Sequence, residues 1–418
     1  MSPGEIRGSS FLRGRKVAGL STAGSHPMGV AFQDEVGTRF VAWLDGLPEG
    51  RRTHVHVLCD SDADGLPAGA LLVRALRSAG FSAVTAEARR KGESAWGSEV
   101  LARLRECAPG ALIVADLGSR DGELLPGVPT LLLDHHCPIG VPEGAVLITG
   151  YGTGAEGGDG KDVPTTGLMA WWCARALVGE DLAEEWLWLA GISLLSDLGD
   201  KAPFAELARA KTIFGGGALR EATSLLNAPR RTASANADAA LRLLLKADGP
   251  KQVLSGEFPE TTDLLAAKAE VGAALASARK LPPRFSRAMR EELGADLVAI
   301  RIDTPCQVHP LIAMQWRARF PKSVVLGVNT GYRPGWVHFS GRAPAGVNLL
   351  QFLARHRPEG ADAGYGLGHN QASGGALPIE VWNRWAAELG FGPELQVRTP
   401  SAAAQAPQAS ESERDVDR

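Results

Sequence analysis

One apolar run in the chain ends in a carboxylate and two imidazoles. Thr130 and Leu131–Leu133 form the run, and Asp134, His135 and His136 follow it. A short apolar run bounded by polar turn residues is typical of a strand that is buried on both faces of a parallel sheet. Open parallel sheets bind their ligands at the carboxyl ends of the strands. The pattern therefore predicts that these polar side chains lie at the ligand-binding edge of an α/β domain.

Other apolar segments of the chain also end in acidic residues. These residues are Asp60, Asp62 and Asp64 after the strand-like run 53–59, Asp116 after the run 111–115, and Asp197 after a helical segment. Carboxylates this close together repel one another unless cations neutralise them. The set offers oxygen and imidazole ligands without an obligatory thiolate. It therefore suits Mn²⁺ or Mg²⁺ better than a structural zinc ion.

These segments resemble the motifs of the DHH phosphoesterase superfamily, which contains RecJ exonucleases, nanoRNases and inorganic pyrophosphatases. The first motif corresponds to residues 56–65, the second to Asp116, the third to residues 134–136 and the fourth to Asp197, in the family's order. The resemblance implies two divalent cations, Mn²⁺ in first place and Mg²⁺ in second. It implies that their ligands are His56, Asp60, Asp62, Asp116, His135 and Asp197. Strand periodicity does not distinguish His56 from His54, and the family's spacing favours His56.

Three further residues of the same motifs receive roles. His136 is the expected catalytic residue, because a histidine beside a ligand can donate a hydrogen bond to the scissile phosphate or to the leaving oxygen near neutral pH. Asp134 and Asp64 are expected to be structural or to support the ligands from behind. Asp64 could instead cap the helix that begins near Leu66, and a direct ligand role for it stays open.

The carboxyl-terminal part resembles the DHHA1 substrate domain. The segment 366–375 matches that domain's glycine-rich histidine loop, except that Leu367 replaces the first glycine, and Arg342 matches a phosphate-binding arginine. The resemblance implies that Arg342, Gly368 and His369 bind substrate. A guanidinium group is a planar donor for phosphate oxygens, and glycines let backbone amides approach an anion.

Alternating strand and helix patterns predict an α/β fold with a doubly wound parallel sheet in the first domain. We expect a DHH catalytic domain over residues 31–200, a helical insertion and connector over 201–294, and a smaller α/β DHHA1-like domain over 295–397. Residues 1–30 and 398–418 have compositions typical of disordered segments.

Composition limits the remaining choices. The formal net charge is −3 and the pI is near 6.3, so binding of a polyanion would depend on local arginines and metal. The five cysteines lack Cys-x-x-Cys spacing, which argues against a disulfide framework and a zinc ribbon and favours the cytoplasm. No apolar stretch reaches the length of a membrane span, so we expect no membrane association. The oligomeric state stays open.

The resemblance implies a metal-dependent phosphodiesterase that hydrolyses single-stranded DNA or RNA, or short oligonucleotides, from an end, as RecJ does. The first alternative is a nanoRNase or a nucleotide phosphatase acting on 3′-phosphoadenosine 5′-phosphate or on dinucleotides derived from cyclic dinucleotides. The second alternative is a non-catalytic scaffold that binds nucleic acid. The sequence does not separate DNA from RNA or 5′ from 3′ polarity.

Overall fold

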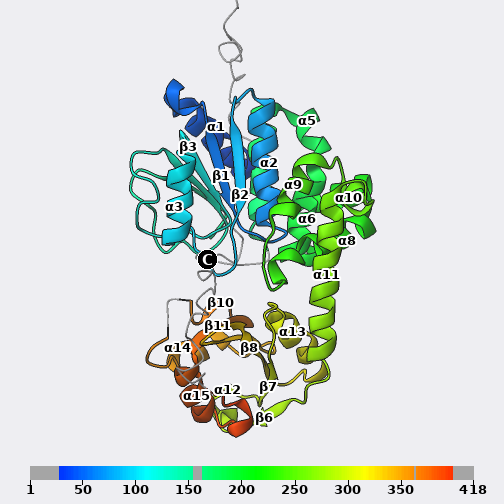
Figure 1. Ribbon diagram of the computed structural model, residues 1–418. Coiled ribbons are helices and arrows are strands. Elements are labelled where there is room, and N and C mark those ends of the chain that lie inside the picture. Colours follow the sequence, from blue (N-terminus) through cyan, green and yellow to red (C-terminus); the bar gives the residue numbers. More distant parts are fainter. Residues whose placement is uncertain (1–27, 154–161, 362–363, 399–418) are drawn as a thin grey trace, which may run out of the picture.

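The computed structural model describes residues 28–153, 162–361 and 364–398 (Figure 1). It forms two α/β lobes, and the long helix α11 (Pro259–Ala278) runs from the first lobe to the second. Helix α1 (Met28–Gly46) begins inside the segment for which disorder was predicted. Residues 1–27 and 399–418 lie outside the described residues, and so does the disorder predicted for them.

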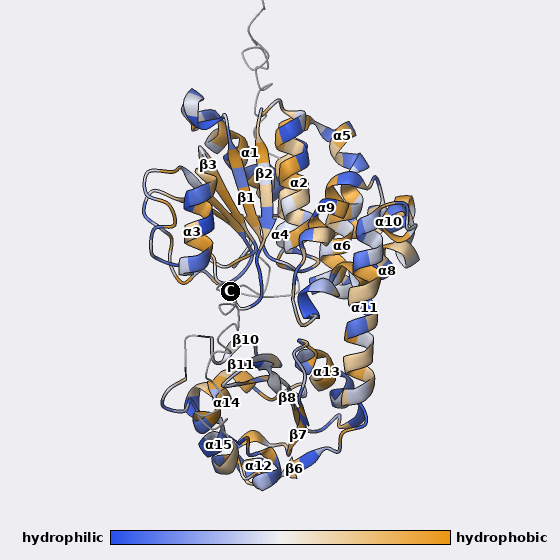
Figure 2. Ribbon diagram, viewed as in Figure 1, coloured by the Kyte–Doolittle hydropathy of each residue, from blue (hydrophilic) through white to orange (hydrophobic). Residues whose placement is uncertain are grey.

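The first lobe contains a parallel five-stranded sheet with the order β2-β1-β3-β4-β5. Its strands are β1 (Val55–Cys59), β2 (Val84–Ala88), β3 (Ala111–Ala115), β4 (Thr130–Asp134) and β5 (Val146–Thr149). Every residue of β1, β3 and β4 is buried, as expected for central strands of a parallel sheet, and Figure 2 shows that β1 and β3 are mostly hydrophobic. The predicted doubly wound parallel sheet is confirmed.

Helices cover both faces of this sheet. Helices α1, α2 (Gly65–Ser78) and α4 (Thr166–Val178) pack on one face, and α3 (Ser98–Cys107) packs on the other. Successive strand residues point to opposite faces, so Val57 joins the core beneath α2 and α4 whereas Leu58 joins the core beneath α3. The two layers hold the carboxyl ends of the strands in a fixed arrangement.

A group of helices lies beside the first sheet and leads into α11. They are α5 (Glu180–Glu185), α6 (Leu187–Asp197), α7 (Ala205–Ala210), α8 (Gly216–Leu226), α9 (Asp238–Lys246) and α10 (Pro250–Leu254). Trp171 and Trp188 are fully buried in the core that these helices share with the sheet. Helices α7 to α11 fall within residues 201–294, the range expected for a helical insertion and connector.

The second lobe is built on a mixed six-stranded sheet with the order β10-β11-β9-β8-β7-β6. Its strands are β6 (Arg284–Ser286), β7 (Leu297–Ile302), β8 (Val324–Arg333), β9 (Trp336–Arg342), β10 (Leu367–His369) and β11 (Ala372–Pro378). Among the strand pairs of this sheet, only β7 and β8 are parallel, and α13 (His309–Arg319) connects them. Helices α12 (Arg290–Leu293), α14 (Leu349–Arg355) and α15 (Ile379–Glu388) contribute to the core on the other face. The sheet includes β6, which precedes the expected domain start at residue 295.

The lobes meet at the carboxyl edge of the first sheet. Lys91, which follows β2, donates hydrogen bonds to the carbonyl oxygens of Ala233 and Pro305, at 3.1 and 2.9 Å. Its Nζ lies 4.2 Å from the ring centre of Tyr332 on β8. The strand ends that carry the acidic motifs therefore face the second lobe.

Among the described residues, no helix has the length and apolar character needed to cross a membrane.

Candidate metal centre

Acidic and imidazole side chains from separate parts of the chain converge at this edge. Three overlapping groups have ligand atoms within 4.8 Å of one another: Asp60 with Asp62 and Asp116, Asp64 with His135 and Asp197, and Asp116 with His135 and His136. Asp116 and His135 each occur in two groups. The side chains therefore form one cluster, which includes all the sequence-predicted ligands except His56.

His135 occupies the centre of this cluster. Its Nε2 atom lies 3.5 Å from Asp116, 3.5 Å from Asp197 and 3.6 Å from Asp64. These distances are too long for good hydrogen bonds. Two ligand atoms that are each about 2.1 Å from one ion lie roughly 3.0–3.4 Å apart in octahedral or tetrahedral geometry. The spacing around His135 is close to that of ligands arranged around a common cation.

The electrostatics of the cluster also fit a bound cation. Burial raises the pKa of Asp116 well above its ordinary value, and the charges of Asp64, Asp62 and other carboxylates raise it further. The pKa of Asp197 is raised well above its ordinary value by the same causes, burial first. Buried carboxylates that repel one another in this way are stabilised when a divalent ion neutralises them. The donor set, rich in carboxylates and with an imidazole, suits Mn²⁺ or Mg²⁺.

Asp64 is fully buried and faces the cluster. Its carboxylate accepts hydrogen bonds from the backbone of Thr166 and Gly167, at 3.0 and 2.7 Å, and from the hydroxyl of Ser193 at 2.5 Å. Its Oδ2 lies within the group formed with His135. No side-chain capping bond links Asp64 to α2, so the structure does not support the alternative role as a helix cap. The structure places Asp64 among the candidate ligands.

The turn after β1 is shaped by Asp62 and Gly65. Asp62 Oδ1 accepts the backbone N–H groups of Asp64 and Gly65, at 2.9 and 3.0 Å. A Cβ atom at Gly65 would lie 2.7 Å from the backbone N and O of Asp60, so a larger residue would force the turn open. Burial opposes ionisation of Asp62, but Arg230 and the two N–H donors outweigh it and lower the pKa. Asp62 is therefore a carboxylate at neutral pH.

Asp116 directly follows β3 and has a left-handed backbone, at φ 66°. Among residues other than glycine, Asp and Asn adopt this conformation most readily, and it turns the chain sharply away from the sheet. Asp116 is 3 % exposed, and its Oδ1 accepts a hydrogen bond from Thr166 Oγ1 at 2.9 Å. The turn holds the Asp116 carboxylate between Asp60 and Asp62 on one side and His135 and His136 on the other.

Asp134 orients His136. Its Oδ1 accepts the backbone N–H and the Nδ1–H of His136, at 2.7 and 2.8 Å, while Oδ2 accepts the backbone N–H of Gly118 at 2.6 Å. Burial acts to lower the pKa of His136, but the hydrogen bond and charge of Asp134 outweigh it and raise the pKa to about 9. His136 is therefore a half-exposed cation at neutral pH. Asp134 lies directly behind His136, on the side of the ring away from solvent.

The structure does not bring His56 to the cluster. His56 lies within β1, four residues before Asp60, and its Nδ1 is 2.8 Å from the hydroxyl of Thr85. It belongs instead to a group with His54 and Cys107. Because its side chain points to the face of the sheet covered by α3, it does not reach the carboxyl edge. This placement corrects the ligand role expected for His56, and Asp64 takes its place among the grouped residues.

A small basic pocket, with room for only a few water molecules, lies beside the acidic cluster. Its lining combines both lobes and comprises Ser61, Arg89, Arg90, Lys91, Gly92, Arg230, Ala235, Gln307 and Tyr332. Arg89 forms an ion pair with Asp60 at 2.8 Å, and Arg230 NH1 lies 3.5 Å from Asp62 Oδ2. Cations joined to the acidic cluster in this way can hold a phosphate next to it.

The sequence interpretation did not single out these basic residues. Arg89, Arg90 and Lys91 directly follow β2, so their position after a strand is the same signal that identified the acidic residues. Arg230 lies in the helical region, between α8 and α9. Nothing in the local sequence links it to a strand end, and only the tertiary fold brings it to Asp62.

The expected substrate-binding residues of the second lobe lie on β9 and β10, the two strands that flank β11. Arg342 ends β9, and its NH1 donates to Ser340 Oγ at 2.9 Å. It is close enough to His309 for its charge to contribute to lowering that residue's pKa. Gly368 lies in β10 with φ 127°, and a Cβ there would approach Ala372 O to 2.4 Å, so the strand pairing alone requires glycine. His369 pairs with Ala372 through its backbone. The side chain of His369 lies outside the described residues.

Solved structures share this architecture. RecJ from Thermus thermophilus in complex with Mn²⁺ superposes with a TM-score of 0.59 and 19 % identity, over 86 % of this chain and 54 % of that chain. An exonuclease RecJ bound to manganese gives a TM-score of 0.55 and 21 % identity, over 90 % and 97 % of the two chains. The DHH domain of a protein assigned to a family of ribosomal proteins gives 0.56 and 14 %, over 87 % and 92 %.

The protein spans about half the length of the Thermus thermophilus RecJ chain. No family model matches the sequence, and no curated protein matches it. At these identities the likeness concerns the fold, which extends over both lobes. The fold expected from the sequence motifs is confirmed: the chain has the two-lobed α/β architecture of the DHH domain proteins and of RecJ.

Proposed function

We propose that the protein is a DHH-type phosphodiesterase that hydrolyses single-stranded nucleic acid or short oligonucleotides from an end with two divalent ions, Mn²⁺ before Mg²⁺. The observation that carries the proposal is the cluster centred on Asp116 and His135, with the basic pocket directly beside it. The acidic cluster would bind the cations, and the basic pocket would bind a phosphate group. A phosphodiester at the boundary would contact both.

The ligand groups suggest how the residues divide between two ions. Asp60 and Asp62 would hold one ion, and Asp64, His135 and Asp197 would hold the other, with Asp116 shared between them. Divalent ions bound by these residues would supply Lewis-acid chemistry, namely activation of a water and neutralisation of charge on the phosphoryl oxygens. The buried hydrogen bonds from Thr166 and Ser193 keep Asp116 and Asp64 oriented for this task.

His136 is the proposed catalytic residue. Asp134 binds its Nδ1, so Nε2 is left to donate toward the substrate. The hydrogen bond and the charge of Asp134 favour the protonated ring, which is the form that donates to a phosphate or to a leaving oxygen. Its partial exposure gives substrate access to it.

The basic pocket provides the proposed contact with the nucleic acid backbone. Arg89 and Arg230 are already ordered by Asp60, Asp62 and Asn227, so little side-chain entropy is lost when a phosphate binds. Tyr332 and Gln307 reach the same pocket from the second lobe. Arg342 and Gly368 of that lobe, and His369, are proposed to bind a neighbouring part of the substrate, as their motifs imply.

Cleavage of labelled oligonucleotides tests the proposal. Single strands of DNA and RNA, from dinucleotides to about 30 residues and labelled at either end, are incubated with the protein and Mn²⁺. Shortening from one end supports the exonuclease, and cleavage restricted to di- and trinucleotides supports the nanoRNase alternative. The Asp116→Asn variant should be inactive, whereas Asp263→Asn, at an exposed site on α11, should retain activity. Failure of the wild-type protein to cleave any of these substrates while Mn²⁺ is bound would reject the catalytic proposal in favour of the scaffold.

A further inference from the structure

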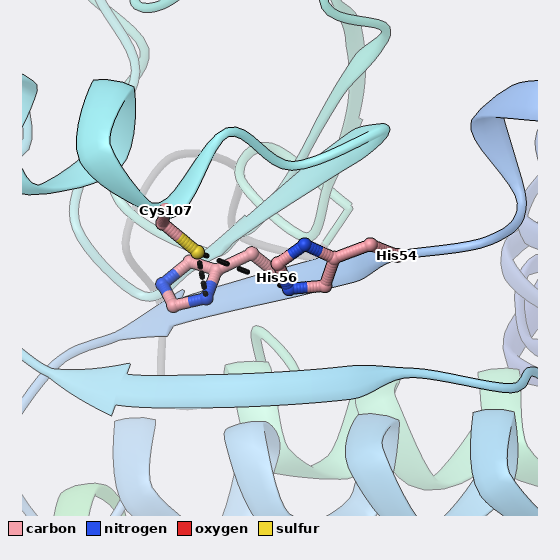
Figure 3. Close-up of side chains that lie close together, drawn as sticks. All are labelled: His54, His56 and Cys107. Carbon is pink, nitrogen blue, oxygen red and sulfur yellow. Dashed lines mark hydrogen bonds between the residues drawn. The ribbon is translucent and has the colours of Figure 1, made fainter.

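A second group of potential metal ligands lies away from the acidic cluster. It contains His54, His56 and Cys107, whose ligand atoms are within 4.8 Å of one another (Figure 3). His54 precedes β1, His56 lies within it, and Cys107 is the last residue of α3. Six residues of extended chain separate His54 from Asp60, which is about 20 Å. The group is therefore at the opposite end of β1 from the phosphodiesterase centre.

Distances within this group match those of a thiolate and imidazole site. Cys107 Sγ lies 3.5 Å from His56 Nδ1 and 3.8 Å from His54 Nε2. In a tetrahedral zinc site, with Zn–S of about 2.3 Å and Zn–N of about 2.0–2.1 Å, the sulfur and a nitrogen ligand are roughly 3.5 Å apart. Small side-chain adjustments would bring all three atoms to one ion.

The surroundings of His56 supply a second observation. His56 is 6 % exposed in an otherwise apolar strand, and its Nε2 has no hydrogen-bond partner among the described residues. That atom faces Glu87 Oε1 at 3.9 Å, which also has none there. Histidines that bind metal through one nitrogen usually direct the other N–H to a carboxylate. Binding through Nδ1 places the N–H of His56 on the side of Glu87.

Glu87 is itself held in place. Its Oε2 accepts a hydrogen bond from Arg103 Nε at 3.2 Å, and Arg103 binds Glu93 through two further bonds of 2.5 and 2.8 Å. The Thr85 hydroxyl lies 2.7 Å from His54 Nε2 and 2.8 Å from His56 Nδ1, so the two ring nitrogens already point to a common polar atom. Thr85 is exposed, so solvent reaches this side of the group.

We propose that His54 Nε2, His56 Nδ1 and Cys107 Sγ form a zinc site that is separate from the phosphodiesterase centre. Two imidazoles and a thiolate favour Zn²⁺ over Mn²⁺ or Mg²⁺, whereas the carboxylate-rich cluster has the opposite preference. The two sites therefore take different ions. A zinc ion here links the end of α3 to β1, beside the edge strand β2.

Cobalt spectroscopy on the metal-free full-length protein tests this site, because only a thiolate ligand gives the intense sulfur-to-cobalt charge-transfer band. One equivalent of Co²⁺ should produce the band in the wild type, and Zn²⁺ should remove it by displacement. Cys107→Ser should abolish it, and His54→Ala should weaken Co²⁺ binding at least about 10-fold. Cys137→Ser, which changes the exposed cysteine beside His136, should retain the band.

The outcome is independent of catalysis. Asp116→Asn, which removes the shared carboxylate of the acidic cluster, should retain the cobalt band, so failure of the proposed phosphodiesterase activity leaves this test intact. Absence of the band in the folded wild type, or its persistence in Cys107→Ser, would overturn the zinc proposal. Thermal unfolding adds a second readout: Zn²⁺ should raise the Tm of the Asp116→Asn variant by more than it raises the Tm of the double variant Asp116→Asn with Cys107→Ser.

Discussion

The Nε2 atom of His135 lies 3.5 Å from Oδ1 of Asp116. The two atoms are farther apart than partners in a good hydrogen bond and have about the spacing of two ligands on one ion. Burial raises the pKa of Asp116 well above its ordinary value, and burial lowers that of His135. Without a cation, burial therefore opposes both the ionised carboxylate of Asp116 and the protonated ring of His135. These are the two charged forms that an ion pair between them would need. A shared divalent ion removes this conflict.

The first prediction concerns the balance between metal binding and stability at Asp116. Asn can adopt the left-handed backbone and keep an oxygen for Thr166, but it carries no charge. Metal-free Asp116→Asn should be more stable than the wild type, by about 1 kcal/mol, because a buried repulsion is relieved. Mn²⁺ should stabilise the variant less. A 100-fold loss of affinity removes about 2.7 kcal/mol of ligand stabilisation at saturating metal.

Denaturant titrations with and without Mn²⁺ measure both effects. Asp263→Asn is the control and should respond to Mn²⁺ as the wild type does. Equal stabilisation of the wild type and Asp116→Asn by Mn²⁺ would show that Asp116 does not bind the ion.

The second prediction concerns the turn between β1 and α2. Gly65→Ala would place a Cβ atom 2.7 Å from backbone atoms of Asp60. We expect the turn to move, with a loss of about 1–3 kcal/mol in unfolding free energy and a drop in Mn²⁺ affinity. Gly46→Ala is the matched control, because no atom lies within 4 Å of a Cβ at that site. Calorimetry of unfolding and of Mn²⁺ binding measures both; unchanged Mn²⁺ binding in Gly65→Ala would contradict the role of the turn.

A third prediction separates substrate capture from chemistry. Arg230→Gln removes a cation from the basic pocket without removing a proposed metal ligand. It should raise KM for an oligonucleotide about 10-fold, with a smaller change in kcat, and should reduce the salt dependence of binding. Arg384→Gln, at an exposed site on α15, should leave KM unchanged. Steady-state kinetics at several salt concentrations is the measurement; a fall in kcat at constant KM would assign Arg230 to the chemical step instead.

The fourth prediction is an acid sensitivity of the second lobe. His309 is buried and close to His338 and Arg342, and burial is the main cause that lowers its pKa from 6.5 to about 3. Below pH 6.5 the unfolded chain takes up a proton that the folded protein does not, so stability falls as the pH decreases. Between pH 7 and pH 5 this residue should cost about 2 kcal/mol.

Urea unfolding of the wild type and of His309→Leu, each at pH 7 and pH 5, measures that cost. The variant should lose about 2 kcal/mol less than the wild type over this interval, whatever the substitution does to stability at pH 7. An equal loss in both proteins would mean that His309 titrates normally in the folded state.

The sequence by itself determined the architecture of the first lobe and most of its acidic cluster. Apolar runs such as Leu131–Leu133 identify strands because both faces of a parallel sheet exclude water, and the carboxyl ends of such strands must meet at one edge. Asp60, Asp116 and His135 follow directly from that rule. The motif order added Asp197, although it ends a helix.

Only the tertiary structure shows which distant segments contact the predicted site residues. Strand periodicity places His54 and His56 on the same face, but only the packing of α3 shows that this face meets Cys107 and not the acidic cluster. Arg230 reaches Asp62 across a separation of 168 residues, through the helical region. The residues that a side chain contacts depend on which element packs against it. That packing joins segments that are far apart in the chain.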